Sequence, residues 1–408
     1  MKCRHCQTGL SLSLVDLGSS PPSNAYLTEK TLLAPEKYFP LRVLVCTECW
    51  LVQTEDYAGA DELFSADYAY FSSFSTTWLE HAERYIADMV QRFELGTQSH
   101  IVEVAANDGY LLQYAKSEGI PCLGIEPTTS TAEAARTKGI EVVEDFFGIK
   151  LAEELVLQGK QADLMVANNV LAHVPDINDF VSGFTVLLKP NGVATFEFPH
   201  LLRLVADNQF DTIYHEHYSY LSLTSVKRVF DYNGLSVFDV EELSTHGGSL
   251  RVYAQRKDEG DKEISQRISL LLAREESEGI ATPEYYRGFQ EKANRVKNDF
   301  LLFLIEANRT GKTVVGYGAA AKGNTLLNYA GVSTDLLSYV VDRNPVKQGK
   351  FLPGSRIPIY DEQKLKLSQP DYVVIFPWNI HSEVIEQLSY ITEWNGQFVT
   401  VVPRLVEG

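Results

Sequence analysis

Residues 100–127, HIVEVAANDGYLLQYAKSEGIPCLGIEP, decide the fold that we predict for this chain. They have the pattern of a buried strand, a helix that ends at a glycine, and a second strand. The same alternation continues downstream through TAEAARTKG, IEVVEDFF, ADLMVANNV, VSGFTVLLKPNG and VATFEFP. Since strands that alternate with helices form a parallel sheet covered by helices, we predict an α/β, doubly wound domain.

The sequence on either side of this stretch predicts three domains. An amphipathic helix over 72–93 leads into the sheet, and LSVFDVEEL and GSLRVYAQR predict an antiparallel pair at its edge. The segment 258–310 is charged and helical in period, and a second α/β unit begins at KTVVGYGAAAKGNTLLNYAG. We therefore expect a small domain over 1–65, the doubly wound domain over 66–257, and a helical connector with a Rossmann-like domain over 258–408.

Bulk composition excludes several classes of protein. The 408 residues carry a net charge of −18, whereas nucleic-acid binding needs a basic face. No apolar run approaches the roughly 20 residues of a membrane span, and MKCRHCQTG has no signal-peptide core. We expect a cytoplasmic protein, a monomer, with a small-molecule substrate and neither nucleic acid nor membrane as partner.

Four of the five cysteines form two C-x-x-C pairs, Cys3 with Cys6 and Cys46 with Cys49. Two such pairs present four thiolates to one tetrahedral ion, which predicts a structural Zn²⁺ site in the N-terminal domain. The 39-residue gap between the pairs exceeds the usual 15–20, so a redox pair or incidental cysteines stay open. The fifth cysteine, Cys122, has no evident role.

The turn after the first strand of the sheet, EVAANDG, lacks the G-x-G-x-x-G of a dinucleotide site. This counts against NAD but not against S-adenosylmethionine, which has no phosphates and carries a cationic sulfonium. Glu126 ends the second strand, where an acid accepts ribose hydroxyls, and Asp145 with Phe146 would meet the adenine. The alternative is a set of ordinary turn and capping residues. The expected cofactor residues are Glu103, Ala105, Asn107, Gly109, Glu126, Pro127, Asp145, Phe146, Asn168 and Asn169.

The second α/β unit starts with a strand, a glycine-containing turn and a helix, VVGYGAAAKGNTLLN. Small residues let backbone amides approach a diphosphate, and an acid about two dozen residues later suits a ribose. A packing domain with a tight turn is the alternative. The expected nucleotide-binding residues are Gly316, Gly318, Lys322, Asn324, Asp342, Lys347 and Lys350.

Residues 211–222, DTIYHEHYSYLS, hold two of the chain's nine histidines. A zinc-protease helix needs His-Glu-x-x-His, whereas His215 and His217 are two apart, so the metalloprotease interpretation fails. If the segment is extended, the two histidines share one face. Tyr218 and Tyr220 are expected to be structural.

Four motifs occur in order along the chain: the paired C-x-x-C, EVAANDGYLL, IYHEHYSYLS, and GYGAAAKGNTLLN with VDRNPVKQGKFLPG. Together they resemble the sugar C-methyltransferases that act on nucleotide-linked 4-keto-6-deoxyhexoses, typically dTDP-linked, in making branched deoxysugars. The resemblance covers essentially the whole chain. It implies zinc in the first domain, S-adenosylmethionine in a class I methyltransferase domain, and a C-terminal domain that helps to hold the nucleotide sugar.

The resemblance also implies catalytic roles. His217 resembles the base that removes the proton from C3, next to the C4 ketone, before the resulting enolate attacks the methyl group. Histidine suits this step because its pKa lies near the operating pH. Its implied companions are Tyr214, Glu216, His173 and Tyr68, with Tyr70 near the sugar. Three rivals stay open: an NAD-dependent oxidoreductase or epimerase, a non-catalytic sugar-nucleotide-binding protein, and a methyltransferase with another ketone acceptor.

Overall fold

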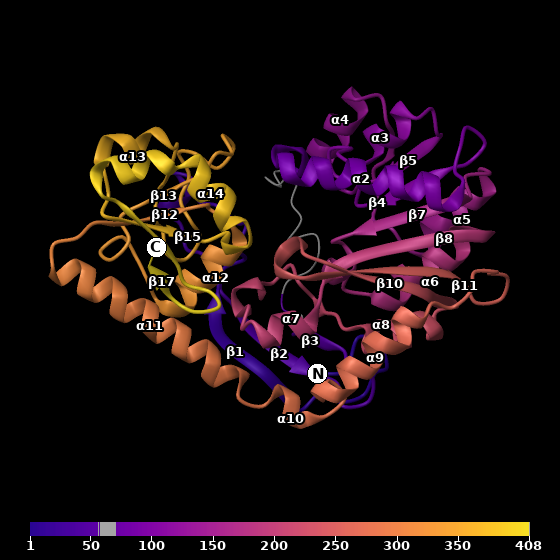
Figure 1. Ribbon diagram of the computed structural model, residues 1–408, viewed down its shortest axis with the longest axis horizontal. Helices are drawn as coiled ribbons and strands as arrows, with labels where there is room; N and C mark the ends of the chain where they lie inside the picture. The colour runs from indigo at the N-terminus through magenta and orange to yellow at the C-terminus, as the bar shows by residue number, and fades with distance from the viewer. Residues whose placement is uncertain (56, 58–70, 408) are drawn as a thin grey trace.

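The computed structural model describes residues 1–55, 57 and 71–407. Its strands form three sheets of seven, six and four strands (Figure 1). The seven-stranded and six-stranded sheets belong to two lobes, and the four-stranded sheet lies near their junction.

The seven-stranded sheet follows the predicted alternation. In chain order its strands are β4 (Ile101–Val104), β5 (Cys122–Ile125), β6 (Glu141–Val143), β7 (Ala162–Asn168), β8 (Leu188–Pro199), β10 (Leu235–Leu243) and β11 (Ser249–Arg256). Their spatial order is β10-β11-β8-β7-β4-β5-β6. Only β11 runs antiparallel to its neighbours, β8 and β10, so the doubly wound sheet with an antiparallel edge pair is confirmed.

Helices cover both faces of this sheet because successive strand residues point to opposite sides. They are α2 (Thr76–Phe93), α3 (Leu112–Ser117), α4 (Thr129–Thr137), α5 (Ile149–Leu157), α6 (Ile177–Leu187) and α8 (Leu223–Tyr232). The short helix α7 (Leu201–Ala206) instead contributes Leu201, Leu204 and Val205 to a different apolar cluster. Ile101 joins the apolar cluster beneath α2 and α3, whereas Val102 joins the cluster beneath α5, α6 and α8. The carboxyl ends of the strands are left as the edge where polar side chains gather.

The six-stranded sheet is the second α/β unit. Its strands are β12 (Val314–Tyr317), β13 (Val340–Val341), β14 (Ile359–Tyr360), β15 (Tyr372–Ile375), β16 (Gln397–Thr400) and β17 (Val406–Glu407). All pair in parallel except β17, in the order β14-β13-β12-β15-β16-β17. Its helices are α12 (Ala321–Ala330), α13 (Gln363–Ser368) and α14 (His381–Gln387).

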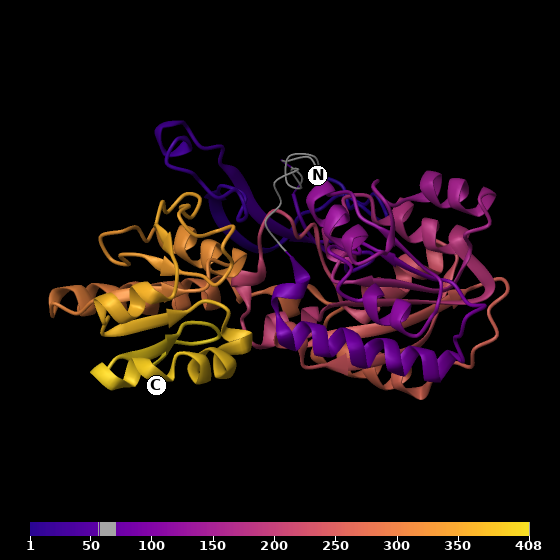
Figure 2. The ribbon, with the colours of Figure 1, turned by 90° about the horizontal axis from the view of Figure 1, so that it is seen from above.

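The four-stranded sheet is antiparallel and draws on two distant parts of the chain. Three strands are N-terminal, β1 (Leu12–Ser20), β2 (Phe39–Val45) and β3 (Val52–Thr54), and the fourth is β9 (Ser219–Tyr220). Between β1 and β2 the chain leaves this sheet and lies along the C-terminal unit (Figure 2), where Leu27 pairs with Phe351. The strand β9 therefore ties the histidine-rich segment directly to the N-terminal sheet.

The connector is helical as predicted, with α9 (Gln266–Glu278), α10 (Pro283–Tyr286) and α11 (Phe289–Arg309). One apolar cluster contains side chains from β1, β2, α11 and the C-terminal sheet, so these parts share a core. Among the described residues no helix is both long and apolar enough to span a bilayer.

Several of the loops discussed below contain short 3-10 helices. They are η1 (Thr31–Leu33), η2 (Ser72–Phe74), η3 (Leu171–His173), η4 (Phe210–Thr212), η5 (Thr245–Gly247), η6 (Trp378–Ile380) and η7 (Ser389–Trp394).

Candidate active site

The turn after β4 holds Glu126 in place at the end of β5. Ala105 and Asn107 adopt φ values of 58° and 48°, which curl the backbone back toward β5. The Asn107 amide donates to Glu126 Oε2 at 2.9 Å, and the Thr128 amide donates to Glu126 Oε1 at 3.0 Å. The structure therefore fixes this carboxylate at the strand end where a ribose-binding acid is expected.

Glu103 and Asn168 give the strand edge unpaired buried polar atoms. Glu103 is 1% exposed, and burial raises its pKa well above the usual range. Within the described residues, Glu103 Oε2 and both amide atoms of Asn168 have no hydrogen-bond partner. Unpaired buried polar atoms are costly unless a ligand satisfies them, and the cationic groups of S-adenosylmethionine suit a buried carboxylate. The residues present therefore fit this cofactor.

The other expected cofactor residues follow strands of the same sheet. Asn169 has a φ of 54° and its Nδ2 lies 3.4 Å from His246 Nε2. Asp145 and Phe146 follow β6, and the Phe146 ring is 49% exposed. Their contact with adenine stays a prediction, as do the roles of Gly109 and Pro127.

His217 is buried in a turn that follows η4. Its Nδ1 lies 2.8 Å from the Thr212 carbonyl, and a carbonyl only accepts. Nδ1 therefore carries the proton, and Nε2 is the unprotonated nitrogen of the neutral ring. Burial is the first cause, and His173 the next, that hold the pKa of His217 well below 6.5. The ring is neutral at pH 7 and Nε2 can accept a proton.

Two of the implied companions contact the His217 ring. The Tyr214 ring centroid lies 3.9 Å from that of His217, and the His173 ring packs edge-on at 4.6 Å. Burial lowers the pKa of His173 to about 4, so this imidazole is also neutral. The structure brings Tyr214, His173 and His217 into one cluster.

Glu216 is hydrogen-bonded to a loop of the N-terminal region. Asn24 Nδ2 donates to Glu216 Oε1 at 3.1 Å, and burial raises the pKa of the Glu216 carboxyl. Asn324 Nδ2 donates to the Ser23 carbonyl at 2.6 Å. The loop around Asn24 thus connects the histidine-rich turn with α12.

The condition under which His215 would share a face with His217 is not met, because the segment is not extended. The His217 amide bonds to the Tyr214 carbonyl at 2.9 Å, which closes a turn. His215 points away and its Nε2 lies 3.2 Å from the Phe39 carbonyl in β2. Tyr218 and Tyr220 are buried, as expected of structural residues. Tyr68 and Tyr70 lie outside the described residues.

Close packing and hydrogen bonds both hold the glycine turn of the C-terminal unit in place. Gly318 has a φ of 88°, and a Cβ there would lie 2.6 Å from Pro377. The Ala319 amide donates to Asp342 Oδ2 at 2.8 Å, and Lys347 Nζ donates to the Ala319 carbonyl at 2.9 Å. Asp342 and Lys347 are thus brought to the turn.

The remaining expected nucleotide-binding residues are more scattered. A Cβ on Gly316 would lie 2.5 Å from the Phe376 ring, so this glycine serves close packing. Lys350 is half-buried on the loop after β13. Lys322 contacts Asn379 and Trp378 instead of the Asp342 and Lys347 pair.

The four cysteines of the C-x-x-C pairs meet at one point. Their sulfurs lie within 4.8 Å of one another, and three of the pairs are 3.4, 3.5 and 3.7 Å apart. A tetrahedral Zn²⁺ with Zn–S bonds of about 2.3 Å holds its sulfurs about 3.8 Å apart. Since this set matches a closed four-thiolate site, Cys3, Cys6, Cys46 and Cys49 fit a structural zinc and leave no position for a substrate.

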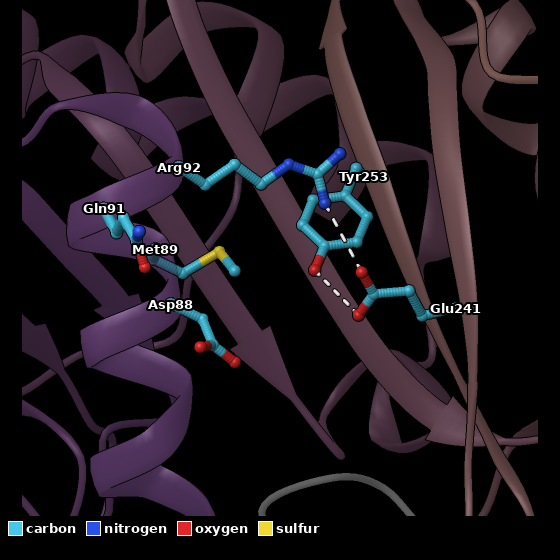
Figure 3. Close-up of a pocket in the computed structure, with 6 residues that line it drawn as sticks. All are labelled: Asp88, Met89, Gln91, Arg92, Glu241 and Tyr253. Atoms are coloured by element: carbon cyan, nitrogen blue, oxygen red, sulfur yellow. Dashed lines mark hydrogen bonds and ion pairs between the residues drawn. The ribbon is translucent and has the colours of Figure 1, made fainter.

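A separate hollow of about 350 Å³ lies between α2 and the antiparallel edge (Figure 3). Arg92 and the Tyr253 hydroxyl both bond to Glu241, at 3.4 and 3.0 Å. Because Arg92 and Glu241 are paired with each other, this hollow is a weaker ligand site than the strand edge.

Several neighbours of the site were not foreseen from the sequence, namely Asn24, Thr212, His246, Trp378 and Asn379. Thr212 lies within the histidine-rich stretch, and His246 belongs to the glycine-rich turn between β10 and β11. No spacing rule connects the others to the site.

The comparisons with known proteins agree with this geometry. Residues 3–64 match a family described as "Putative zinc binding domain", residues 78–240 a methyltransferase domain, and residues 244–403 a C-methyltransferase C-terminal domain. Fold and site therefore define a class I S-adenosylmethionine-dependent methyltransferase.

Proteins of similar sequence indicate which kind of methyltransferase this is. The chain is 34% identical over 403 residues to C-methyltransferase NovU of Streptomyces niveus, covering 99% of this chain and 96% of that protein. It belongs to this C-methyltransferase family and is an S-adenosylmethionine-dependent C-methyltransferase. A shorter match, 30% identical over 106 residues, is the ubiquinone biosynthesis O-methyltransferase of Histophilus somni (strain 2336), covering 24% of this chain and 44% of that protein.

Solved structures match over less than half of the chain. The PH0226 protein of Pyrococcus horikoshii OT3 matches with a TM-score of 0.39 and 13% identity, over 46% of this chain and 95% of that one. Magnesium protoporphyrin IX methyltransferase of Synechocystis PCC 6803, with bound S-adenosylmethionine, has a TM-score of 0.34 and 15% identity, over 44% and 79%.

Proposed function

We propose that this C-methyltransferase methylates C3 of a nucleotide-linked 4-keto-6-deoxyhexose in the formation of branched deoxysugars, with dTDP as the nucleotide. The observation that carries the proposal is the His217 cluster. The Thr212 carbonyl accepts from Nδ1 of the neutral His217 ring, so Nε2 is free to accept a proton. The rings of Tyr214 and of the neutral His173 contact this imidazole. Removal of a proton next to a ketone needs such a base with polar groups beside it.

The chemistry then follows from the residues of the chain. His217 Nε2 accepts the proton from C3, and the electron pair of the C–H bond forms the enolate with the C4 carbonyl. Tyr214 and His173 are the groups that we assign to positioning the ring and the developing oxyanion. Bound S-adenosylmethionine supplies the electrophilic methyl group that C3 attacks. Holding the reactants together contributes up to about 7–11 kcal/mol in well-oriented systems.

The C-terminal unit supports a nucleotide-linked acceptor. Lys347 and Asp342 meet at the glycine turn before α12, and α12 packs against the catalytic segment. The ammonium of Lys347 at this turn, in a chain of net charge −18, suits a diphosphate. A small ketone without a nucleotide would give this unit no ligand to hold.

The test is mass spectrometry of the purified protein incubated with S-adenosylmethionine and dTDP-4-keto-2,6-dideoxyglucose, beside His217→Asn. We expect the sugar nucleotide to gain one methyl group with the wild type and none with the variant. Wild-type protein that binds S-adenosylmethionine but leaves this sugar nucleotide unmethylated would refute the proposed acceptor and favour another ketone.

A further inference from the structure

Lys322 lies where the C-terminal unit meets the catalytic segment. It is the second residue of α12, which Figure 1 shows at the junction of the two lobes. Its Nζ donates to Asn379 Oδ1 at 2.7 Å and lies 4.2 Å from the centre of the Trp378 ring. An ammonium group has three N–H donors, and the bond to Asn379 uses one of them.

The partners of Lys322 are fixed to the backbone that holds the base. Trp378 Nε1 donates to Asp211 Oδ2 at 2.7 Å, and the next residue, Thr212, provides the carbonyl that orients His217. On the same helix as Lys322, Thr325 Oγ1 donates to the Ile213 carbonyl at 2.8 Å. The lysine and the base are therefore anchored to the same three residues, 211–213.

A third segment, the turn η5, closes this junction from the cofactor side. A Cβ on Gly247 would lie 2.5 Å from the Trp378 ring, so the turn packs directly on the indole. Its neighbour His246 lies 3.4 Å from Asn169 at the end of β7. The positive charge of Lys322 contributes to lowering the pKa of both His217 and His246, which agrees with an ammonium near both rings.

Lys322 is distinct from the charges of the glycine turn. Lys347 is the lysine that bonds to the Ala319 carbonyl and lies 3.5 Å from Asp342 Oδ2. The two lysines thus occupy two places, one beside the expected nucleotide residues and one beside the catalytic turn.

We propose that Lys322 is a catalytic residue, whose ammonium group donates a hydrogen bond to the carbonyl oxygen next to the carbon that His217 deprotonates. This inference rests on the proposed function and adds to it a residue from the C-terminal unit. A fixed cation aimed at the oxygen where negative charge develops lowers the barrier to enolate formation.

The reaction consists of a proton transfer followed by a methyl transfer. The C–H proton moves to His217 Nε2, and the C–H electron pair forms the carbon–carbon double bond while the carbonyl π pair moves onto oxygen beside Lys322. When the carbon–methyl bond forms, the carbonyl is restored, and the sulfur–methyl bond breaks with its electron pair on sulfur. The proton on His217 then leaves to solvent.

The test separates enolate formation from nucleotide binding. Wild type, Lys322→Met and Lys322→Arg are each saturated with dTDP-4-keto-2,6-dideoxyglucose in D₂O without S-adenosylmethionine. Loss of the C3 proton signal is followed by NMR, and the Kd of dTDP is measured separately. We expect Lys322→Met to slow exchange by about 10²–10³-fold, the usual effect of removing one oxyanion donor. The Kd of dTDP should change less than threefold, and Lys322→Arg should keep more of the exchange rate than the methionine variant.

Controls make each outcome decisive. Lys292→Met removes an exposed lysine on α11 and should exchange like the wild type. An unchanged melting temperature and S-adenosylmethionine affinity for Lys322→Met show that the variant is folded. Wild-type exchange at saturation in Lys322→Met, with dTDP affinity lowered tenfold or more, would overturn the inference and make Lys322 a diphosphate contact. Wild-type protein that neither exchanges nor methylates this sugar would overturn the proposed function and, with it, the inference.

Discussion

A single backbone carbonyl determines how the His217 side chain can react. Because Thr212 O accepts from Nδ1, the other ring nitrogen stays unprotonated, and the Tyr214 and His173 rings limit rotation of the imidazole. Burial also disfavours the imidazolium. The ring is thus held as a neutral proton acceptor, which the proposed deprotonation requires.

The pH dependence of the reaction tests this arrangement. In the proposed mechanism the reaction needs His217 unprotonated, so kcat/KM should fall as pH falls through the pKa of His217. Burial, His173, Lys322 and His246 all lower that pKa, and the carbonyl of Thr212 opposes them. We therefore expect kcat/KM for methyl transfer to stay level from about pH 7 to below pH 6.5 and to decline, about tenfold per unit, at lower pH. Burial lowers the pKa of Lys322 to about 8, so loss of its ammonium should lower kcat/KM again above that pH. An acid limb centred at pH 7 or higher would contradict the geometry.

Two turns, η5 and η6, fit together through a glycine. Gly247 has a φ of 85°, and a Cβ there would lie 2.5 Å from Trp378 and 2.9 Å from Gln209 Nε2. Gln209 donates to the Gly247 carbonyl at 2.8 Å. A side chain at 247 would therefore displace the indole that holds Asp211.

Gly247→Ala should lower kcat for methyl transfer by roughly tenfold or more, because small misplacements of catalytic groups have large effects on rate. The matched control is Gly311→Ala, at a φ of 73° with nothing within 4 Å of the added Cβ. Both variants carry the strain of an L-residue in the left-handed region, roughly 1 kcal/mol. Equal loss of kcat in both would show that strain alone, and not the contact with Trp378, is responsible.

The first C-x-x-C turn is connected to the turn that contains His217 through Arg4. Its guanidinium donates to the Thr54 and Pro175 carbonyls at 2.9 and 3.0 Å, and Thr54 Oγ1 donates to the His217 carbonyl at 3.1 Å. Arg4 therefore acts on the base through Thr54.

Arg4→Met should lower kcat several-fold with KM and zinc content unchanged, and shift the acid limb of the pH profile, because the backbone of His217 loses a support. Arg4→Lys should recover part of the rate, since an ammonium can reach one of the two carbonyls. The exposed Arg287 provides the control, as Arg287→Met should have wild-type kinetics. A zinc content that falls with kcat in Arg4→Met would point to general damage of the metal site.

At the scale of the whole molecule, local patterns predicted the two α/β sheets and their order in the chain, but not the four-stranded sheet that includes β9. The strand–helix alternation, the antiparallel pair and the helical connector are confirmed. Contacts between distant segments were not predictable, because no periodicity relates residues such as Asn24 and Glu216, 192 positions apart, or Asp211 and Trp378, 167 apart. Hydrogen bonding within residues 214–217 also decided against an extended segment.

The N-terminal sheet is the part that joins all three regions. It pairs with β9 of the catalytic segment, shares an apolar core with α11 and the C-terminal sheet, and is closed at one end by the four cysteines. Zinc binding to such a site is coupled to folding, because the four thiolates meet only in the native state.

Loss of zinc should therefore affect the whole enzyme and not only its first domain. Cys46→Ser should lose bound zinc, lower the melting temperature by roughly 5–10 °C and reduce methyl transfer, because β2, β3 and β9 lose their common support. The matched control is Cys122→Ser, since Cys122 lies in β5 apart from the cluster, and it should keep its zinc and activity. Metal content, calorimetry and methyl-transfer rate are measured on both variants. If Cys46→Ser kept wild-type stability and rate after losing its metal, the zinc site would be separate from the catalytic scaffold, and the coupling through β9 would be refuted.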